Sequence, residues 1–230
     1  MPAPKHIVIF SHGFGTKKDD RGLLSGEHGI AEALQEQGIE TILFDYNDVN
    51  EDTQYITVRP LSIQIKMLAD VIAESRERNE DVIIDIIAHS QGCITPAKLM
   101  PEGIRKIIFV APSLDVNNQR MIDQFKDRPG TIIDLEGTST FGGRKDGTTT
   151  IVPKEYWVER GNALPIPLFN ALSKITELTM IRPNQDDILG NMSIDGLSKE
   201  IKVIYLDGNH GFHGEKDRTK LIETIKNILI

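Results

Sequence analysis

A chain of 230 residues with 39% hydrophobic residues is suited to one globular domain with a sizeable core. Its formal net charge of -8 argues against nucleic acid or an anionic membrane surface as the main partner. Cys93 is the only cysteine, so neither a disulfide framework nor a thiolate metal cluster is expected, which suits a cytoplasmic protein. The amino-terminal residues lack the apolar core of a signal peptide, and no apolar stretch is long enough to span a bilayer.

Short apolar runs typical of buried strands alternate with amphipathic stretches typical of helices. In chain order the sequence predicts a strand at 5–11, a helix at 22–37, a strand at 40–46, a helix at 61–78, a strand at 82–88, a helix at 93–100 and a strand at 104–110. The alternation returns with strands at 178–181 and 201–206 and a closing helix at 218–230. This order predicts an α/β fold with a mostly parallel central sheet and helices on both faces.

The alternation breaks after residue 111. Strands are predicted at 131–136 and 148–152, with a hairpin turn at Asp146-Gly147. We therefore predict a single domain over residues 1–230, in which residues from about 113 to 172 form a lid-like insertion over the carboxyl edge of the sheet, where ligands bind in such folds. Four aromatic residues of this region are expected to line a substrate pocket or, alternatively, to pack the insertion onto the sheet: Phe141, Tyr156, Trp157 and Phe169.

The stretch 81–92, DVIIDIIAHSQG, joins a predicted strand directly to a predicted helix. At the junction, Ala88-His89-Ser90-Gln91-Gly92 matches the G-x-S-x-G nucleophile elbow, with alanine in the first position. A serine on such a turn projects its hydroxyl from the sheet edge, and the residues two before and two after it must be small to avoid collision. The alternative interpretation is an ordinary strand-to-helix turn in which Ser90 caps the helix.

Partners for a serine nucleophile follow the last two predicted strands. A serine hydroxyl reacts well only when a base removes its proton and a third group orients that base. Asp186 lies in the loop NQDDI after the strand at 178–181, and His210 lies in GNHGF after the strand at 201–206. Asp187, beside Asp186, and Asp115, after the fourth strand, compete for the role of the acid.

Acyl transfer also needs donors for an oxyanion. The loop HGFG after the first strand would offer the backbone N–H of Phe14, and the elbow would offer that of Gln91. With HGFG, IDIIAHSQG, NQDDI and GNHGF in this order at strand ends, nearly the whole chain outside the insertion resembles the α/β-hydrolase superfamily, in a compact version without the two amino-terminal strands. The resemblance implies Ser90 as nucleophile, His210 as base and Asp186 as acid.

We therefore expect a serine hydrolase of the carboxylesterase kind, which cleaves small or medium acyl esters through an acyl-enzyme and needs no cofactor. A metal site is not expected, because His210 and His213 lie in a glycine-containing loop. Two other functions are considered. A non-catalytic small-molecule binder could use the same pocket, and a Rossmann-type oxidoreductase is disfavoured because Lys18 stands where the third glycine of G-x-G-x-x-G would fall.

Overall fold

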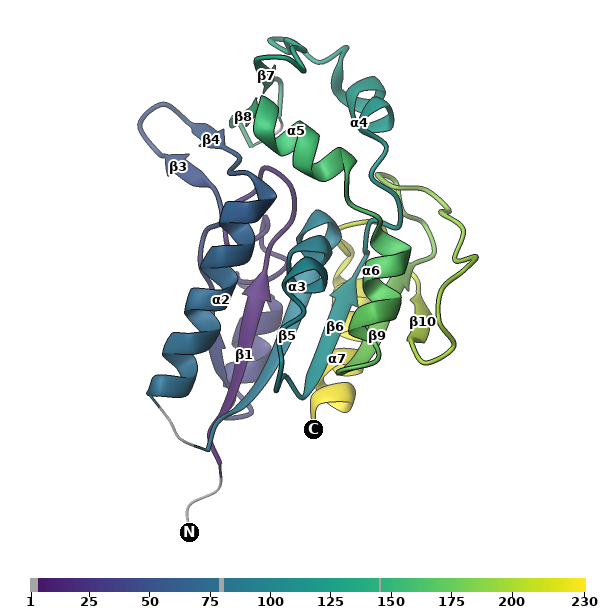
Figure 1. Ribbon diagram of the computed structural model, residues 1–230. Coiled ribbons are helices and arrows are strands. Elements are labelled where there is room, and N and C mark those ends of the chain that lie inside the picture. Colours follow the sequence, from purple (N-terminus) through teal and green to yellow (C-terminus); the bar gives the residue numbers. More distant parts are fainter. Residues whose placement is uncertain (1–3, 79–80, 145) are drawn as a thin grey trace.

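The computed structural model describes residues 4–78, 81–144 and 146–230. Its main feature is a sheet of six strands in the order β10-β9-β6-β5-β1-β2, in which every neighbouring pair is parallel (Figure 1). The strands are β1 (His6–Ser11), β2 (Glu40–Ile42), β5 (Ile83–His89), β6 (Lys106–Val110), β9 (Glu177–Pro183) and β10 (Lys202–Leu206). The predicted α/β fold with a mostly parallel sheet is confirmed.

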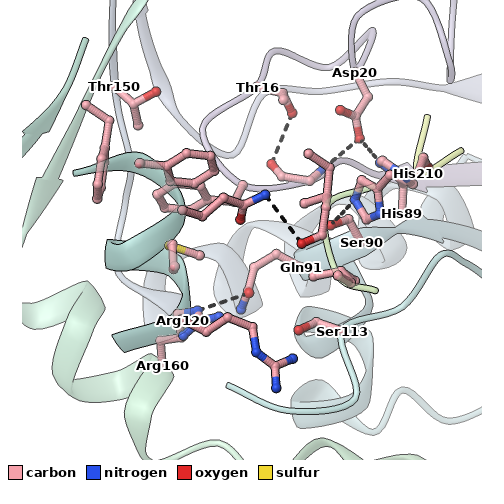
Figure 2. A pocket seen from close by; sticks show the side chains of 18 of the residues that line it. Thr16, Asp20, His89, Ser90, Gln91, Ser113, Arg120, Thr150, Arg160 and His210 are labelled. Atoms are coloured by element: carbon pink, nitrogen blue, oxygen red, sulfur yellow. Dashed lines mark hydrogen bonds and ion pairs between the residues drawn. The ribbon is translucent and has the colours of Figure 1, made fainter. Parts of the chain in front are cut away.

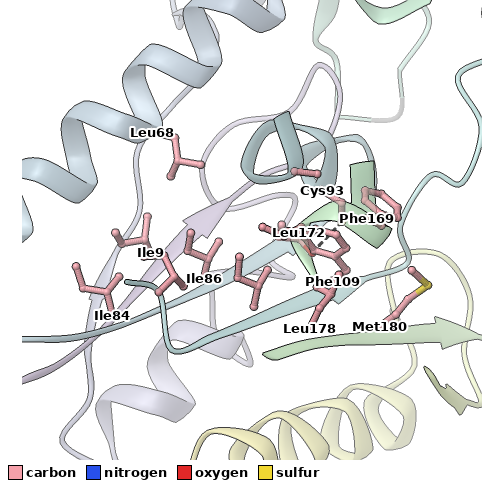
Figure 3. Close-up of a cluster of buried hydrophobic side chains, with 14 of the residues drawn as sticks. Ile9, Leu68, Ile84, Ile86, Cys93, Phe109, Phe169, Leu172, Leu178 and Met180 are labelled. Atoms are coloured by element: carbon pink, nitrogen blue, oxygen red, sulfur yellow. Dashed lines mark hydrogen bonds between the residues drawn. The ribbon is translucent and has the colours of Figure 1, made fainter. Parts of the chain in front are cut away.

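Five helices cover the two faces of this sheet: α1 (Ile30–Gln35), α2 (Leu61–Glu77), α3 (Ile94–Leu99), α6 (Pro165–Leu172) and α7 (Glu215–Leu229). Because alternate residues of a strand point to opposite faces, Ile7 and Ile9 of β1 pack with α2, α3 and α6, whereas Val8 and Phe10 pack with α1 and α7. Figure 3 shows the first of these two clusters. Strands buried on both faces explain the continuous apolar runs in the sequence. Among the described residues, no helix is both long and apolar enough to cross a membrane.

Two elements are much shorter than the sequence predicts. The helix expected over residues 22–37 begins only at Ile30, because Gly22 and Gly26 adopt φ angles of +82° and +152°, which a helix does not allow. The strand expected over residues 40–46 ends at Ile42. By contrast, the helix expected over residues 61–78 is present as α2 and ends one residue earlier.

A second, smaller sheet lies beyond the carboxyl ends of the central strands (Figure 1). Its order is β3-β4-β8-β7, and its strands are β3 (Asp48–Asn50), β4 (Tyr55–Thr57), β7 (Thr138–Phe141) and β8 (Thr149–Pro153). Together with α4 (Asn118–Phe125) and α5 (Lys154–Gly161), these strands form what we call the cap. β3 pairs with β4 in antiparallel fashion, and β4 pairs with β8 in parallel, so that residues before α2 form half of this sheet.

The structure of residues 113–172 differs in two ways from the one that the sequence predicts. The segment 131–136 is not a strand: Ile132 forms a single bridge to Thr140, and its side chain is 64% exposed. The strand that pairs with β8 is β7, a few residues later. At the other end of this region, Phe169 and Leu172 of α6 are buried in the main core rather than in the cap.

Aromatic side chains pack the cap together. Trp157 of α5 is 3% exposed, and its ring lies 5.9 Å from that of Phe141 and 6.1 Å from that of Tyr156, centroid to centroid. Its Nε1–H donates a hydrogen bond of 3.2 Å to Ser139 Oγ. Such a ring combines a large buried apolar area with a satisfied polar group. Trp157 is therefore a central packing residue of the cap.

We expect Trp157→Ala to lower the free energy of unfolding by about 3–5 kcal/mol, because it leaves a cavity in the cap. Val158 is the next residue of the same helix and is 51% exposed, so Val158→Ala is a matched control with an expected loss of about 0.5 kcal/mol or less. Urea unfolding followed by circular dichroism measures both variants. Equal, small losses would contradict the packing role of Trp157.

Candidate active site

The turn after β5 has the steric features of a nucleophile elbow. β5 ends at His89, and the 3-10 turn η1 (Ser90–Cys93) leads into α3. Ser90 has a φ of +53°, a left-handed conformation that residues with a side chain rarely adopt. A Cβ atom on Gly92 would lie 2.3 Å from the carbonyl oxygen of His12, so only glycine fits there. Ala88, two residues before the serine, is fully buried.

The structure brings Ser90, His210 and Asp186 into one hydrogen-bonded line. His210 Nε2 lies 2.9 Å from Ser90 Oγ, and His210 Nδ1 lies 3.0 Å from Asp186 Oδ2. Because the carboxylate only accepts hydrogen bonds, Nδ1 carries the proton and Nε2 is free to accept from the serine hydroxyl. The three residues come from the carboxyl ends of β5, β9 and β10, which parallel pairing places at one edge of the sheet.

Asp186 is held as an ionised acceptor. Its other oxygen, Oδ1, accepts from the backbone N–H groups of Ile188 at 3.0 Å and Leu189 at 2.7 Å. Burial opposes ionisation, but the bond and charge of His210 together with these two N–H groups outweigh it, so the pKa of Asp186 is below its ordinary value. This carboxylate can therefore orient the imidazole over a wide pH range.

The two competing carboxylates have other contacts. Asp187 Oδ1 accepts a hydrogen bond of 3.1 Å from the backbone N–H of His210, so it supports the main chain of the histidine rather than its ring. The turn at Ile188 is capped by Asp186, whose Oδ1 accepts from the backbone N–H of Ile188. Asp115 forms an ion pair of 2.9 Å with Arg120.

The two residues whose backbone N–H groups are expected to bind an oxyanion lie at the cavity beside Ser90. Phe14 and Gln91 line the same cavity as the serine. In the described part of the chain, no acceptor binds the N–H of Phe14. Gln91 lies in the first turn of η1, where helix geometry leaves backbone N–H groups without a partner. The two donors are thus available for a ligand.

A buried bridge that sequence reasoning missed connects the loops of this site (Figure 2). Asp20 Oδ2 accepts from His89 Nδ1 at 2.6 Å and from the backbone N–H of Gly13 at 2.8 Å. His89 Nε2 in turn lies 3.1 Å from the carbonyl oxygen of His210. Both partners of His89 are acceptors, so both ring nitrogens donate and the ring is an imidazolium. The bridge joins the Phe14 loop, the elbow and the His210 loop.

Electrostatics agree with this protonation state. Burial disfavours the charged ring, but the Asp20 carboxylate and the His210 carbonyl outweigh it, so the pKa of His89 is raised. Burial likewise opposes the charge of Asp20, but His89 and the Gly13 N–H hold the pKa of this carboxyl well below its ordinary value. The pair is therefore a buried, hydrogen-bonded ion pair of the kind that is costly to break.

A cavity of about 140 Å³ opens beside Ser90 and His210. Apolar side chains on its wall are Phe14, Met121, Phe125, Phe141, Ile188, Leu189 and Met192, and the charged ones include five arginines. Of the four aromatic residues expected to line it, Phe141 does so. Tyr156 and Trp157 are buried together with Phe141 in a cluster of apolar side chains, and Phe169 packs against Phe109 in the main core. These three rings serve packing because their helices, α5 and α6, direct them toward neighbouring elements.

No protein-family model and no curated protein matches the chain. Several solved structures do resemble it. Est1E from Butyrivibrio proteoclasticus matches over 99% of this chain and 88% of its own, with a TM-score of 0.68 and 17% identity. A monoacylglycerol lipase from Paleococcus ferrophilus matches over 98% and 95%, with a TM-score of 0.65 and 14% identity. Alpha/beta hydrolase domain-containing protein 10 from mouse matches over 97% and 89%, with a TM-score of 0.64 and 17% identity. These likenesses show a shared fold.

We expect Asp20→Asn to lower the free energy of unfolding by about 3 kcal/mol, because it leaves a buried imidazolium without its counter-ion. The matched control is Glu74→Gln, which removes an exposed pair with Arg78 and should cost about 0.5 kcal/mol or less. Urea unfolding of both variants and the parent gives the comparison. A loss no larger than that of the control would contradict the bridge.

The pH dependence of this loss follows from the two pKa shifts. Because the pKa of His89 is raised in the folded protein, its contribution to the free energy of unfolding is fully present below the ordinary pKa of 6.5. This contribution disappears as the pH rises through the pKa of His89 in the folded state. Because the pKa of Asp20 is lowered in the folded protein, its contribution to the free energy of unfolding is present above the ordinary pKa of 3.8. This contribution disappears as the pH falls through the pKa of Asp20 in the folded state. The difference in stability between parent and Asp20→Asn should therefore be greatest between about pH 4 and pH 6.5 and smaller on either side.

Proposed function

We propose that this chain, which has the fold of the α/β-hydrolases, is a serine hydrolase that cleaves carboxylic esters. The observation that carries the proposal is the hydrogen-bonded line from Ser90 through His210 to Asp186, which opens into a cavity beside two backbone donors. A hydroxyl bound to a base that is itself oriented by a carboxylate is the arrangement that acyl transfer needs. The monoacylglycerol lipase among the similar structures supports an ester as substrate.

In the proposed reaction, Ser90 Oγ attacks the ester carbonyl carbon while His210 Nε2 takes the hydroxyl proton. The carbonyl oxygen becomes an oxyanion, which the N–H groups of Phe14 and Gln91 bind. The tetrahedral intermediate collapses, the alcohol leaves with the proton from His210, and an acyl-serine remains. Water, deprotonated by His210, then attacks the acyl carbon, and the acid is released as the proton returns to Ser90. Asp186 stabilises the imidazolium that exists in each tetrahedral stage.

The dimensions of the cavity favour a small or medium ester. A volume of about 140 Å³ holds only a short chain or a small ring, well below the pockets of several hundred Å³ that enclose drug-sized ligands. Phe14 and Phe141 supply apolar walls, with ring centroids 6.2 Å apart. No step of the reaction requires a cofactor or metal, since every proton transfer is assigned to a residue of the chain.

Ser90→Ala should abolish rapid labelling by a fluorophosphonate probe and reduce kcat for 4-nitrophenyl butyrate by about 10⁴-fold or more, because the nucleophile is lost. Stability should change little, since Ser90 sits at the cavity. Ser113→Ala is the control, because Ser113 also lines the cavity but donates its hydroxyl to the carbonyl of Asp115. A parent protein that neither reacts with the probe nor cleaves esters would support the non-catalytic binder instead.

Asp186→Asn should reduce kcat by up to about 10⁴-fold with little change in KM, the size of effect seen in serine proteases when an amide replaces the orienting carboxylate. The amide keeps the shape but stabilises the wrong tautomer of His210. Asp187→Asn is the matched control, because its amide oxygen can still accept from the N–H of His210, and its effect on kcat should be about tenfold at most. Steady-state kinetics of the two variants test the assignment, and the reverse ranking would move the role to Asp187.

A further inference from the structure

The cavity beside Ser90 is rich in arginine although the chain as a whole is acidic. The formal net charge is -8, yet the cavity wall holds five of the chain's eleven arginines: Arg21, Arg120, Arg128, Arg144 and Arg160. The carboxylates on the wall are Asp20, which is paired with His89, and Asp115. Arginine presents a planar set of donors that matches carboxylate and phosphate groups, so its concentration at one site indicates an anion.

The positive charge of this wall is only partly neutralised. Arg120 pairs with Asp115 at 2.9 Å, and Arg21 pairs with Asp146 at 3.4 Å. Within the described part of the chain, no carboxylate oxygen lies within 4.0 Å of the other three guanidinium groups, which belong to Arg128, Arg144 and Arg160. A group of guanidinium groups without a carboxylate in contact, gathered around one cavity, attracts an anionic ligand.

Arg160 carries this charge to the elbow itself. It is 4% exposed, and its guanidinium donates to Gln91 Oε1 at 3.1 Å (Figure 2). It also donates to the carbonyl of Val116 at 2.8 Å and to Asn118 Oδ1 at 2.5 Å. All three acceptors are neutral. Burying a cation is unfavourable unless an opposite charge is supplied, and a bound anion would supply it.

The other two arginines have donor groups to spare. The Arg128 side chain makes no hydrogen bond to a described residue; its guanidinium lies over the ring of Phe125, 4.3 Å from the centroid. Burial and the nearby charge of Arg21 lower the pKa of Arg128, the direction expected for a cation that lacks an anionic partner. Arg144 donates through Nη1 to the carbonyl of Gly15, but its buried Nε–H has no partner among the described residues.

From this arrangement we infer that the substrate of the proposed reaction is an anionic ester, with a carboxylate or phosphate group held by the cavity arginines while its ester carbonyl lies at Ser90. This inference rests on the proposed serine hydrolase activity and adds the substrate class to it. The apolar wall remains suited to a short acyl chain between the two ends. With a neutral ester bound, these three buried or half-buried guanidinium groups would still have no carboxylate of a described residue within 4.0 Å.

The first test compares matched pairs of esters on the parent enzyme. One pair has the charge on the acyl side: mono-4-nitrophenyl adipate and its neutral amide, 4-nitrophenyl adipamate. The other has it on the alcohol side: 1-butyrylglycerol 3-phosphate and 1-monobutyrin. We expect kcat/KM for the anionic ester of at least one pair to exceed that for its neutral partner by about 10- to 100-fold. This is the rate difference that corresponds to the free energy of one hydrogen bond to a charged group. A preference in the first pair would indicate a carboxylate on the acyl side of the ester, and a preference in the second pair would indicate a phosphate on the alcohol side.

The second test removes one cation. Arg128→Gln should reduce the anionic-to-neutral ratio of kcat/KM by about tenfold, and Arg128→Lys should retain part of it, because lysine keeps the charge but loses the planar fork. Arg78→Gln is the control: Arg78 lies at the exposed end of α2 and pairs with Glu74, so the ratio should not change. Raising sodium chloride from about 0.05 to about 0.5 M should lower kcat/KM for the anionic ester of the pair but not for its neutral partner, because salt screens the attraction of the arginines. This measurement uses the parent enzyme alone.

Each result decides between the two proposals. A ratio of one or less in both pairs, with the neutral esters hydrolysed, would overturn the anionic substrate and leave the serine hydrolase standing. A preference that survives unchanged in a folded Arg128→Gln would overturn the role of Arg128. If no ester of either pair is cleaved and the fluorophosphonate does not label Ser90, the hydrolase proposal fails and the substrate class fails with it.

Discussion

The rest of the structure depends on how β5 ends. This strand is buried between β1 and β6, and its last residue passes directly into Ser90, whose φ of +53° is unfavourable for a side-chain-bearing residue. Such strain persists only when the surroundings hold it. Gly92 packs against the backbone of His12 so closely that no Cβ fits, and the neighbouring His89 is fixed by Asp20. The sheet therefore fixes the position of the hydroxyl, and the loops of the site are arranged around it.

The central sheet and the serine line could be predicted because their signals are local. Each buried strand is a short apolar run, and parallel strands bring their carboxyl ends to one edge, so polar residues just after the runs at β5, β9 and β10 had to meet there. The choice between Asp186 and Asp187 was harder, since neighbouring carboxylates look alike in sequence. It depended on which of them reached the ring of His210 and which reached its backbone N–H, and only the three-dimensional loop distinguishes them.

What the sequence did not reveal depends on contacts between distant residues. β4 pairs with β8 across more than ninety positions, and nothing in either three- to five-residue strand identifies its partner. Asp20 follows another aspartate in a polar loop, where only the fold shows that its carboxylate is buried against His89. The arginines of the cavity come from segments spread between residues 21 and 160. Net charge, an average over the whole surface, gave no sign of the positive cavity within an acidic chain.

The buried imidazolium of His89 raises a question of charge, because its ring centroid lies only 4.9 Å from that of His210. An unpaired cation at that distance would oppose protonation of the proposed base. Asp20 removes this conflict: the ion pair it forms with His89 has no net charge, and its remaining field is that of a short dipole. Among the described residues, the one positively charged or titratable cationic group within ion-pair distance of Asp186 is His210 itself. The carboxylate that contacts His210 is thus one whose charge His89 does not neutralise, so in the proposed reaction it can stabilise the proton that His210 would accept from Ser90.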